Sequence, residues 1–77
     1  MKQKHEEIYK KLKFNIMYTR KMQEMTQEQL AEKSGISRTH MSNIEAPHGT
    51  TGLSLDVLID IADALGVSVA KLFEFRD

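Results

Sequence analysis

Apolar residues recur along this 77-residue chain at intervals of three and four, the period of helices with one buried face. Where the pattern is interrupted, glycine or proline occurs, and a serine or threonine that can cap a helix precedes the next apolar run. The sequence therefore predicts an all-α fold without strands. The expected helices lie near residues 4–23, 27–34, 38–46, 55–65 and 69–74.

The signals at the helix ends are most complete between residues 26 and 45. Thr26 can cap a helix, and Gln29 three residues later completes a capping box, which satisfies two backbone donors at the helix start. Gly35 can end this helix because glycine adopts a left-handed conformation without steric cost. Ser37 can then cap the next helix. These residues predict two short helices joined by a tight turn.

The second of these helices has two different faces. At about 100° per residue, Met41 and Ile44 fall on one side. The opposite side is entirely polar and consists of Arg38, Thr39, Ser42 and Asn43. Such a face is suited to contact a polar partner.

The other helices should supply the rest of the core. The expected buried stripe of the first helix is Ile8, Leu12, Ile16 and Thr19. In the fourth helix it is Leu55, Leu58, Ile61, Ala62 and Leu65, and the last helix adds Val69, Leu72 and Phe73. We expect the lysines of the first helix to form a solvated face: Lys10, Lys11 and Lys13.

Length and composition limit the chain to one domain over residues 1–77. A chain of this size buries only about 60–65% of its unfolded surface, so it needs tight packing or a partner subunit. The absence of cysteine excludes disulfides and cysteine-based metal sites. The charged first residues predict no signal peptide, and aspartates interrupt the apolar stretch 53–72, which predicts no membrane span. We therefore expect a cytoplasmic protein.

The net charge is zero, but the charges are unevenly distributed. Residues 1–45 carry three more cationic than acidic side chains, and residues 46–77 carry three more acidic ones. This asymmetry is compatible with a basic side that faces phosphates and an acidic side that faces solvent.

The segment MTQEQLAEKSGISRTHMSNIE, from Met25 to Glu45, resembles the helix-turn-helix of phage repressor and Cro-type DNA-binding proteins. Residues 54–73 are similar to the last two helices of that family, and residues 12–21 to its first helix. The block RTHMSNIE also resembles the recognition helix of restriction-modification controller proteins. The resemblance implies a compact five-helix bundle of the lambda-repressor-like type, with its motif at residues 26–45.

The resemblance also implies roles for individual residues. The positions from which the family reads base edges are held here by Arg38, Thr39, Ser42 and Asn43. Arginine can bind guanine through O6 and N7, and asparagine can bind adenine through N6 and N7. The expected phosphate contacts are Gln27, Thr26 and His40.

A structural ion pair is implied as well. In the resembling family an arginine of the first helix pairs with the glutamate that ends the recognition helix, and Arg20 and Glu45 hold these positions. A bidentate pair would fix the orientation of the helix more than it would stabilise the fold. The alternative is that these are two unrelated surface charges.

The loop over residues 46–53 departs from the family. It is longer than in relatives and contains no Lys or Arg, so the phosphate contacts expected from this loop lack their usual donors. His48, Thr50 and Thr51 are the remaining candidates.

Apolar residues outside the core stripes predict a homodimer on a palindromic operator. The expected interface residues are Val57, Ile59, Ala64 and Val69, with Phe75 at the tail. Phe14 and Tyr18 form another apolar pair, which either covers the C-terminal helix or contributes to a dimer.

None of the sequence motifs that we considered for an enzyme active site is present. His5, His40 and His48 lack metal-ligand spacing, and neither a GxSxG motif nor a glycine-rich phosphate loop occurs. We expect no catalytic activity, metal, cofactor or small-molecule ligand. The sequence predicts a small transcriptional regulator that binds double-stranded DNA. The alternative is a protein-interaction module of the same fold, such as an antitoxin-type partner binder.

Overall fold

A computed structural model describes residues 3–47 and 53–75, and within these ranges the chain is helical and has no strand. The elements are α1 (Gln3–Met22), α2 (Gln27–Ser34), α3 (Arg38–Glu45), α4 (Leu55–Leu65) and α5 (Val69–Leu72). The all-α prediction is confirmed, and the last helix ends two residues earlier than expected. The loop residues His48, Thr50 and Thr51 lie outside the described residues.

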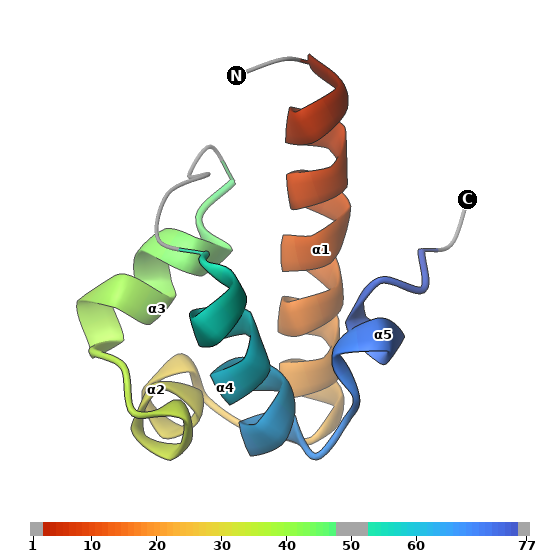
Figure 1. Cartoon of the computed structure of the whole chain (residues 1–77). Coiled ribbons are helices and arrows are strands. Elements are labelled where there is room, and N and C mark those ends of the chain that lie inside the picture. The colour runs from red at the N-terminus through yellow and green to blue at the C-terminus, as the bar shows by residue number, and fades with distance from the viewer. Residues whose placement is uncertain (1–2, 48–52, 76–77) are drawn as a thin grey trace.

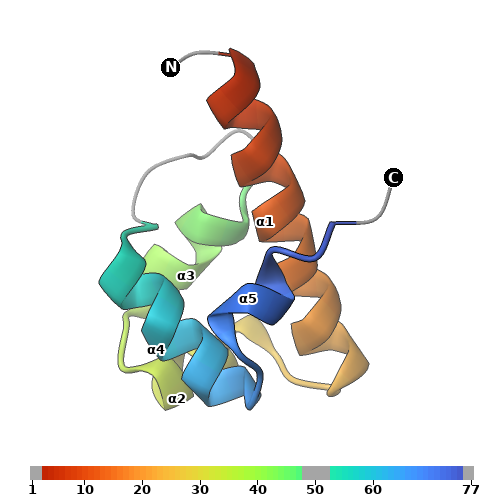
Figure 2. The ribbon, with the colours of Figure 1, turned by 45° about the vertical axis from the view of Figure 1, so that its right-hand side comes forward.

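The long helix α1 is the support for most of the bundle. It contacts α3, α4 and α5, and α2 packs against α3 and α4 (Figure 1). Figure 2 shows the short helix α5 lying across α1, on the far side of α4 from α2. The motif helices α2 and α3 therefore sit at one side of the molecule, held there by α1 and α4.

One hydrophobic core joins all five helices. The largest side chains that are fully buried are Ile16, Leu30, Met41, Ile44, Ile61 and Leu72. Each such side chain stabilises the fold by about 1.5–3 kcal/mol relative to an exposed one. Because α3 contributes Met41 and Ile44, its inner face is fixed to the rest of the bundle.

The helix ends have the caps that the sequence predicts. The Thr26 hydroxyl accepts from the Gln29 amide at 3.0 Å, and the Gln29 side chain accepts from the Thr26 amide at 2.8 Å, which completes the capping box. Gly35 ends α2 with φ +74°, a left-handed conformation that strains residues with a side chain. Ser37 caps α3 by accepting from the His40 amide.

The predicted core was wrong at three positions. Leu55 is 67% exposed, Phe73 is 43% exposed and Ile8 is 39% exposed. Leu55 is the first residue of α4, Phe73 follows the last residue of α5, and Ile8 lies in the second turn of α1. The three side chains border one shallow depression between the N-terminal half of α1 and the start of α4.

Candidate functional site

The exposed side chains of α3 are all polar. Its four predicted base-reading side chains are exposed: Arg38, Thr39, Ser42 and Asn43. On the inner face, Met41 and Ile44 have no exposed surface. The helix is therefore fixed from behind and polar in front, which is the arrangement required of an element that inserts into a groove.

Arg38, the cationic side chain of this outer face, takes part in a weak ion pair. Arg38 Nη1 lies 3.5 Å from Glu28 Oε2 of α2, and both side chains are more than two-thirds exposed. An exposed pair of this kind contributes about 0–1 kcal/mol, so it can open when a stronger partner arrives. His40, at the edge of the face, is half-buried.

Arg20 and Glu45 form a bidentate ion pair between α1 and the last residue of α3. Arg20 Nε and Nη2 each donate to one oxygen of Glu45 at 2.8 Å. The third nitrogen, Nη1, donates to the Met25 carbonyl at 2.7 Å. Only 9% of the Arg20 side chain and 2% of the Glu45 side chain is exposed. The pair ties the end of α3 both to α1 and to the residues that lead into α2.

Gln27 belongs to the same network. Its Nε2 donates to Glu45 Oε1 at 3.0 Å from the first turn of α2, and the residue is half-buried. The amide that the sequence assigned to phosphate thus has an internal partner, and its role toward DNA stays a prediction. Thr26 is exposed at the start of α2, with its hydroxyl used as the helix cap.

Lys13 corrects the expectation of a solvated lysine face. It is 6% exposed, and its Nζ donates to the carbonyl of Ala46, the residue that caps the C-terminus of α3, at 3.0 Å. Desolvation by burial lowers the pKa of its ammonium group. A spacing signal for this role exists in the sequence, since Lys13, Ile16 and Arg20 recur on one side of α1. Two cations of α1, two turns apart, therefore hold the C-terminal end of α3.

The proposed dimer residues do not form one exposed surface. Ile59 is 48% exposed, whereas Val57, Ala64 and Val69 are half-buried and pack against the core of the same subunit. Phe75 is also half-buried. The exposed apolar surface of α4 is therefore Ile59 with Leu55 one turn before it.

Two further observations concern residues 3–47 and 53–75 only. They contain no group of three or more His, Cys, Asp or Glu side chains arranged to hold a metal ion. None of the helices found there is both long enough and apolar enough to cross a membrane.

Known proteins resemble this chain over the helix-turn-helix motif and the helices that pack against it. Residues 16–72 match the helix-turn-helix family. The chain is 40% identical over 58 residues to control protein C.SmaI of Serratia marcescens, across 75% of this chain and 67% of that protein. It is 43% identical over 51 residues to control protein C.BamHI of Bacillus amyloliquefaciens, across 66% of this chain and 60% of that protein. The matched segment thus spans about two thirds or less of each relative's length.

Proposed function

Because this chain belongs to the Cro/C1-type helix-turn-helix family, we propose that it is a control-protein-type transcriptional regulator that reads the major groove of double-stranded DNA with α3. The observation that carries this proposal is the division of α3 into two faces. Met41 and Ile44 have no exposed surface, while four polar side chains stand in solvent on the other side. Such a regulator works in the cytoplasm, where the DNA is.

In this proposal, the outer face of α3 contacts base edges. Arg38 binds a guanine through O6 and N7, and Asn43 binds an adenine through N6 and N7. Thr39 and Ser42 complete the readout with hydroxyl groups. Before Arg38 can reach a base, it releases Glu28, an exchange that costs little because the pair is exposed.

Phosphate contacts fix the register of α3 on the DNA. Thr26 and Gln27 stand at the N-terminus of α2, where backbone amides and the helix dipole favour an anion. His40 lies beside the base-reading residues of α3. Gln27 can serve both Glu45 and a phosphate, because its amide group carries two N–H donors and one of these meets Glu45.

We further propose that two copies bind a palindrome. One motif of this size contacts too few base pairs for tight and selective binding at cellular salt. A two-fold axis would place the two α3 helices about 34–36 Å apart, which is one turn of DNA.

Selection of bound sequences from a random double-stranded pool tests the proposal. We expect enrichment of one palindrome, with half-sites about one helical turn apart. A salt titration of the selected complex should then show affinity that falls steeply with ionic strength, because phosphate contacts release counterions. A pool without enrichment would instead favour the alternative, a protein-interaction module of the same fold.

A further inference from the structure

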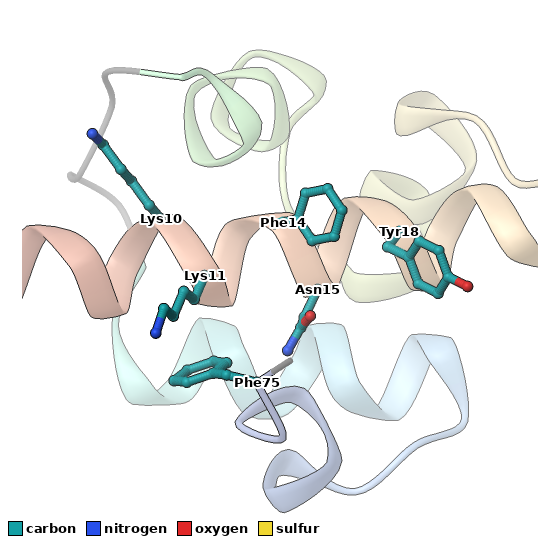
Figure 3. Close-up of a pocket in the computed structure, with 6 residues that line it drawn as sticks. All are labelled: Lys10, Lys11, Phe14, Asn15, Tyr18 and Phe75. Atoms are coloured by element: carbon teal, nitrogen blue, oxygen red, sulfur yellow. The ribbon is translucent and has the colours of Figure 1, made fainter. Parts of the chain in front are cut away.

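Outside the motif, α1 carries a mainly apolar groove, which we call the α1 groove. Its lining consists of Lys10, Lys11, Phe14, Asn15, Tyr18 and Phe75. Figure 3 shows Phe14 and Tyr18 along one side, Phe75 on the other, and both lysines at the end nearer the N-terminus of α1. Phe14 is 57% exposed and Tyr18 is 44% exposed, so about half of each side chain is open to solvent beside Phe75.

The walls of the groove are fixed in place. The rings of Phe14 and Tyr18 stack with centroids 6.1 Å apart and planes at 21°. Asn15 Nδ2 donates to the carbonyls of Leu72 at 2.8 Å and Glu74 at 3.2 Å, which holds the segment after α5 against α1. Lys11 Nζ lies 5.8 Å from the centre of the Phe75 ring. A partner therefore meets a preformed site and need not order it.

The size and charge of the groove define its occupant. Its volume is about 250 Å³, below the range of about 300–1,000 Å³ that small-molecule sites occupy, and enough for one or two large side chains. Among the described residues that line it, two are lysines and none is acidic. The complementary ligand is a peptide segment that offers an apolar side chain to the aromatic walls and carboxylates to the lysines.

We propose that the α1 groove binds an acidic amphipathic helix of a partner protein. A second copy of this chain fits less well, because the described residues that line the groove include no carboxylate to pair with the lysines of the other copy. A single nucleic-acid strand fits less well too, because it needs cations along its whole path and here they stand at one end only. No residue of α3 lines the groove, so a DNA-bound molecule keeps it accessible.

Fluorescence anisotropy with a designed peptide tests the proposal on the full chain. The probe is a labelled 16-residue helical peptide with Leu and Phe on one face and Glu on the other, the pattern of about four turns. One control peptide carries Lys in place of every Glu, and another carries Ser in place of Leu and Phe. We expect the first peptide to bind with micromolar affinity, and each control to bind at least about tenfold more weakly.

Variants then locate the site. Phe14→Ser, Tyr18→Ser and the double change Lys10→Glu with Lys11→Glu should each weaken the acidic peptide by about tenfold or more. Met22→Ser, which removes a 67% exposed side chain of α1 outside the groove, and Lys33→Glu on α2 are the matched controls, and they should change the affinity less than about twofold. Circular dichroism checks that each variant is folded. Because Phe14 and Tyr18 are both exposed, either variant suffices if the other fails to fold.

Three outcomes would overturn the proposal. The acidic peptide could bind all variants equally, which would show that its binding site lies outside the α1 groove. A labelled oligo-dT strand could bind in a Phe14-dependent way where the peptide does not, which would make the surface a nucleic-acid site. The parent could self-associate in sedimentation and lose this on Phe14→Ser, which would make it an interface between copies. None of these measurements depends on the operator, so the proposed DNA binding can fail while this proposal stands.

Discussion

Lys13 of α1 donates a hydrogen bond from its Nζ to the carbonyl of Ala46 at 3.0 Å, directly beyond the last turn of α3. The carbonyl groups at a helix C-terminus have no partners within the helix and carry the negative end of its dipole. A lysine at this place satisfies one of these carbonyls and opposes the dipole. Together with Arg20, it fixes the end of α3 opposite the Ser37 cap.

The substitution Lys13→Met tests this contact. It keeps the apolar stem of the side chain and removes the donor, so the Ala46 carbonyl loses its partner. We expect a loss of about 1–3 kcal/mol in the free energy of unfolding, measured by urea denaturation. Lys10→Met on the exposed side of α1 is the control and should change stability by less than about 0.5 kcal/mol. Equal stability of the two variants would show that the contact has no net effect.

The lowered pKa of Lys13 gives a pH dependence with a defined sign. In the folded protein the ammonium loses its proton below its ordinary pKa of about 10.5. Between the two pKa values the unfolded chain binds more protons, so this group makes stability rise with pH in that window. The stability difference between the parent and Lys13→Met should therefore grow as the pH rises from the folded-state pKa toward 10.5. A difference that shrinks would contradict the burial of this charge.

Removal of Glu45 should have a larger effect. Glu45→Ala leaves the Arg20 guanidinium buried with only the Met25 carbonyl as acceptor, and we expect a loss of about 3–5 kcal/mol in the free energy of unfolding. Calorimetric or urea unfolding measures it. Glu28→Ala removes an exposed ion pair of similar composition and is the control, with an expected loss below about 1 kcal/mol. A loss that small for Glu45→Ala would place Arg20 and Glu45 among ordinary surface charges.

Much of the fold follows from local sequence signals. The capping box of Thr26 and Gln29 and the left-handed Gly35 each depend on residues within a few positions, and the structure contains both features. The buried pair Met41 and Ile44 follows from helical period alone. Arg20 and Glu45 are far apart in the sequence, so no local signal predicts their ion pair. The resemblance to a known family predicts it.

The predictions from sequence fail where the burial of a side chain depends on neighbouring elements. The charge of Lys13 predicts exposure to solvent, but the residue is 6% exposed and its ammonium reaches the C-terminal end of α3. The phase of Leu55 in α4 predicts burial, yet this first residue of the helix is 67% exposed. Val57, Ala64 and Val69 looked superfluous in the pattern, but they fill the edges of the core. Periodicity gives the direction of a side chain, whereas burial depends on what lies opposite.

Substitutions on the outer face of α3 should change which DNA sequences the protein prefers and leave the stability of its fold nearly unchanged. Arg38→Ala and Asn43→Ala should each cost about 1–3 kcal/mol at one operator position and leave the melting temperature nearly unchanged, because both side chains are exposed. Gln27→Ala should weaken binding to all sequences alike. Titration of each variant against every single-base change of the selected operator measures these effects.

Lys71→Ala on α5 is the control for charge alone and should leave the base preferences unchanged. If Arg38→Ala and Asn43→Ala bind the selected operator as tightly as the parent, the assignment of the recognition face is wrong.

The dimer prediction needs different variants from those the sequence suggests. An aspartate at Val57 or Val69 would enter the edge of the core, so loss of dimer could not be separated from loss of fold. Leu55 and Ile59 lie one turn apart on α4 and are 67% and 48% exposed, so an aspartate is hydrated at either place. Leu55 also lines the depression that Ile8 and Phe73 border, and no base-reading residue of α3 lines that depression.

We therefore expect the parent to sediment as a dimer at micromolar concentration, and Leu55→Asp with Ile59→Asp to sediment as a monomer with its helical content retained. The reason is that two aspartates on a two-fold interface bring four like charges together in a place that must exclude water. Met22→Asp, a change to an equally exposed side chain at the end of α1, is the control and should leave the dimer intact. A monomeric parent would refute the dimer itself. A double variant that still dimerises would move the interface away from α4, and Phe14→Asp would then test α1 in its place.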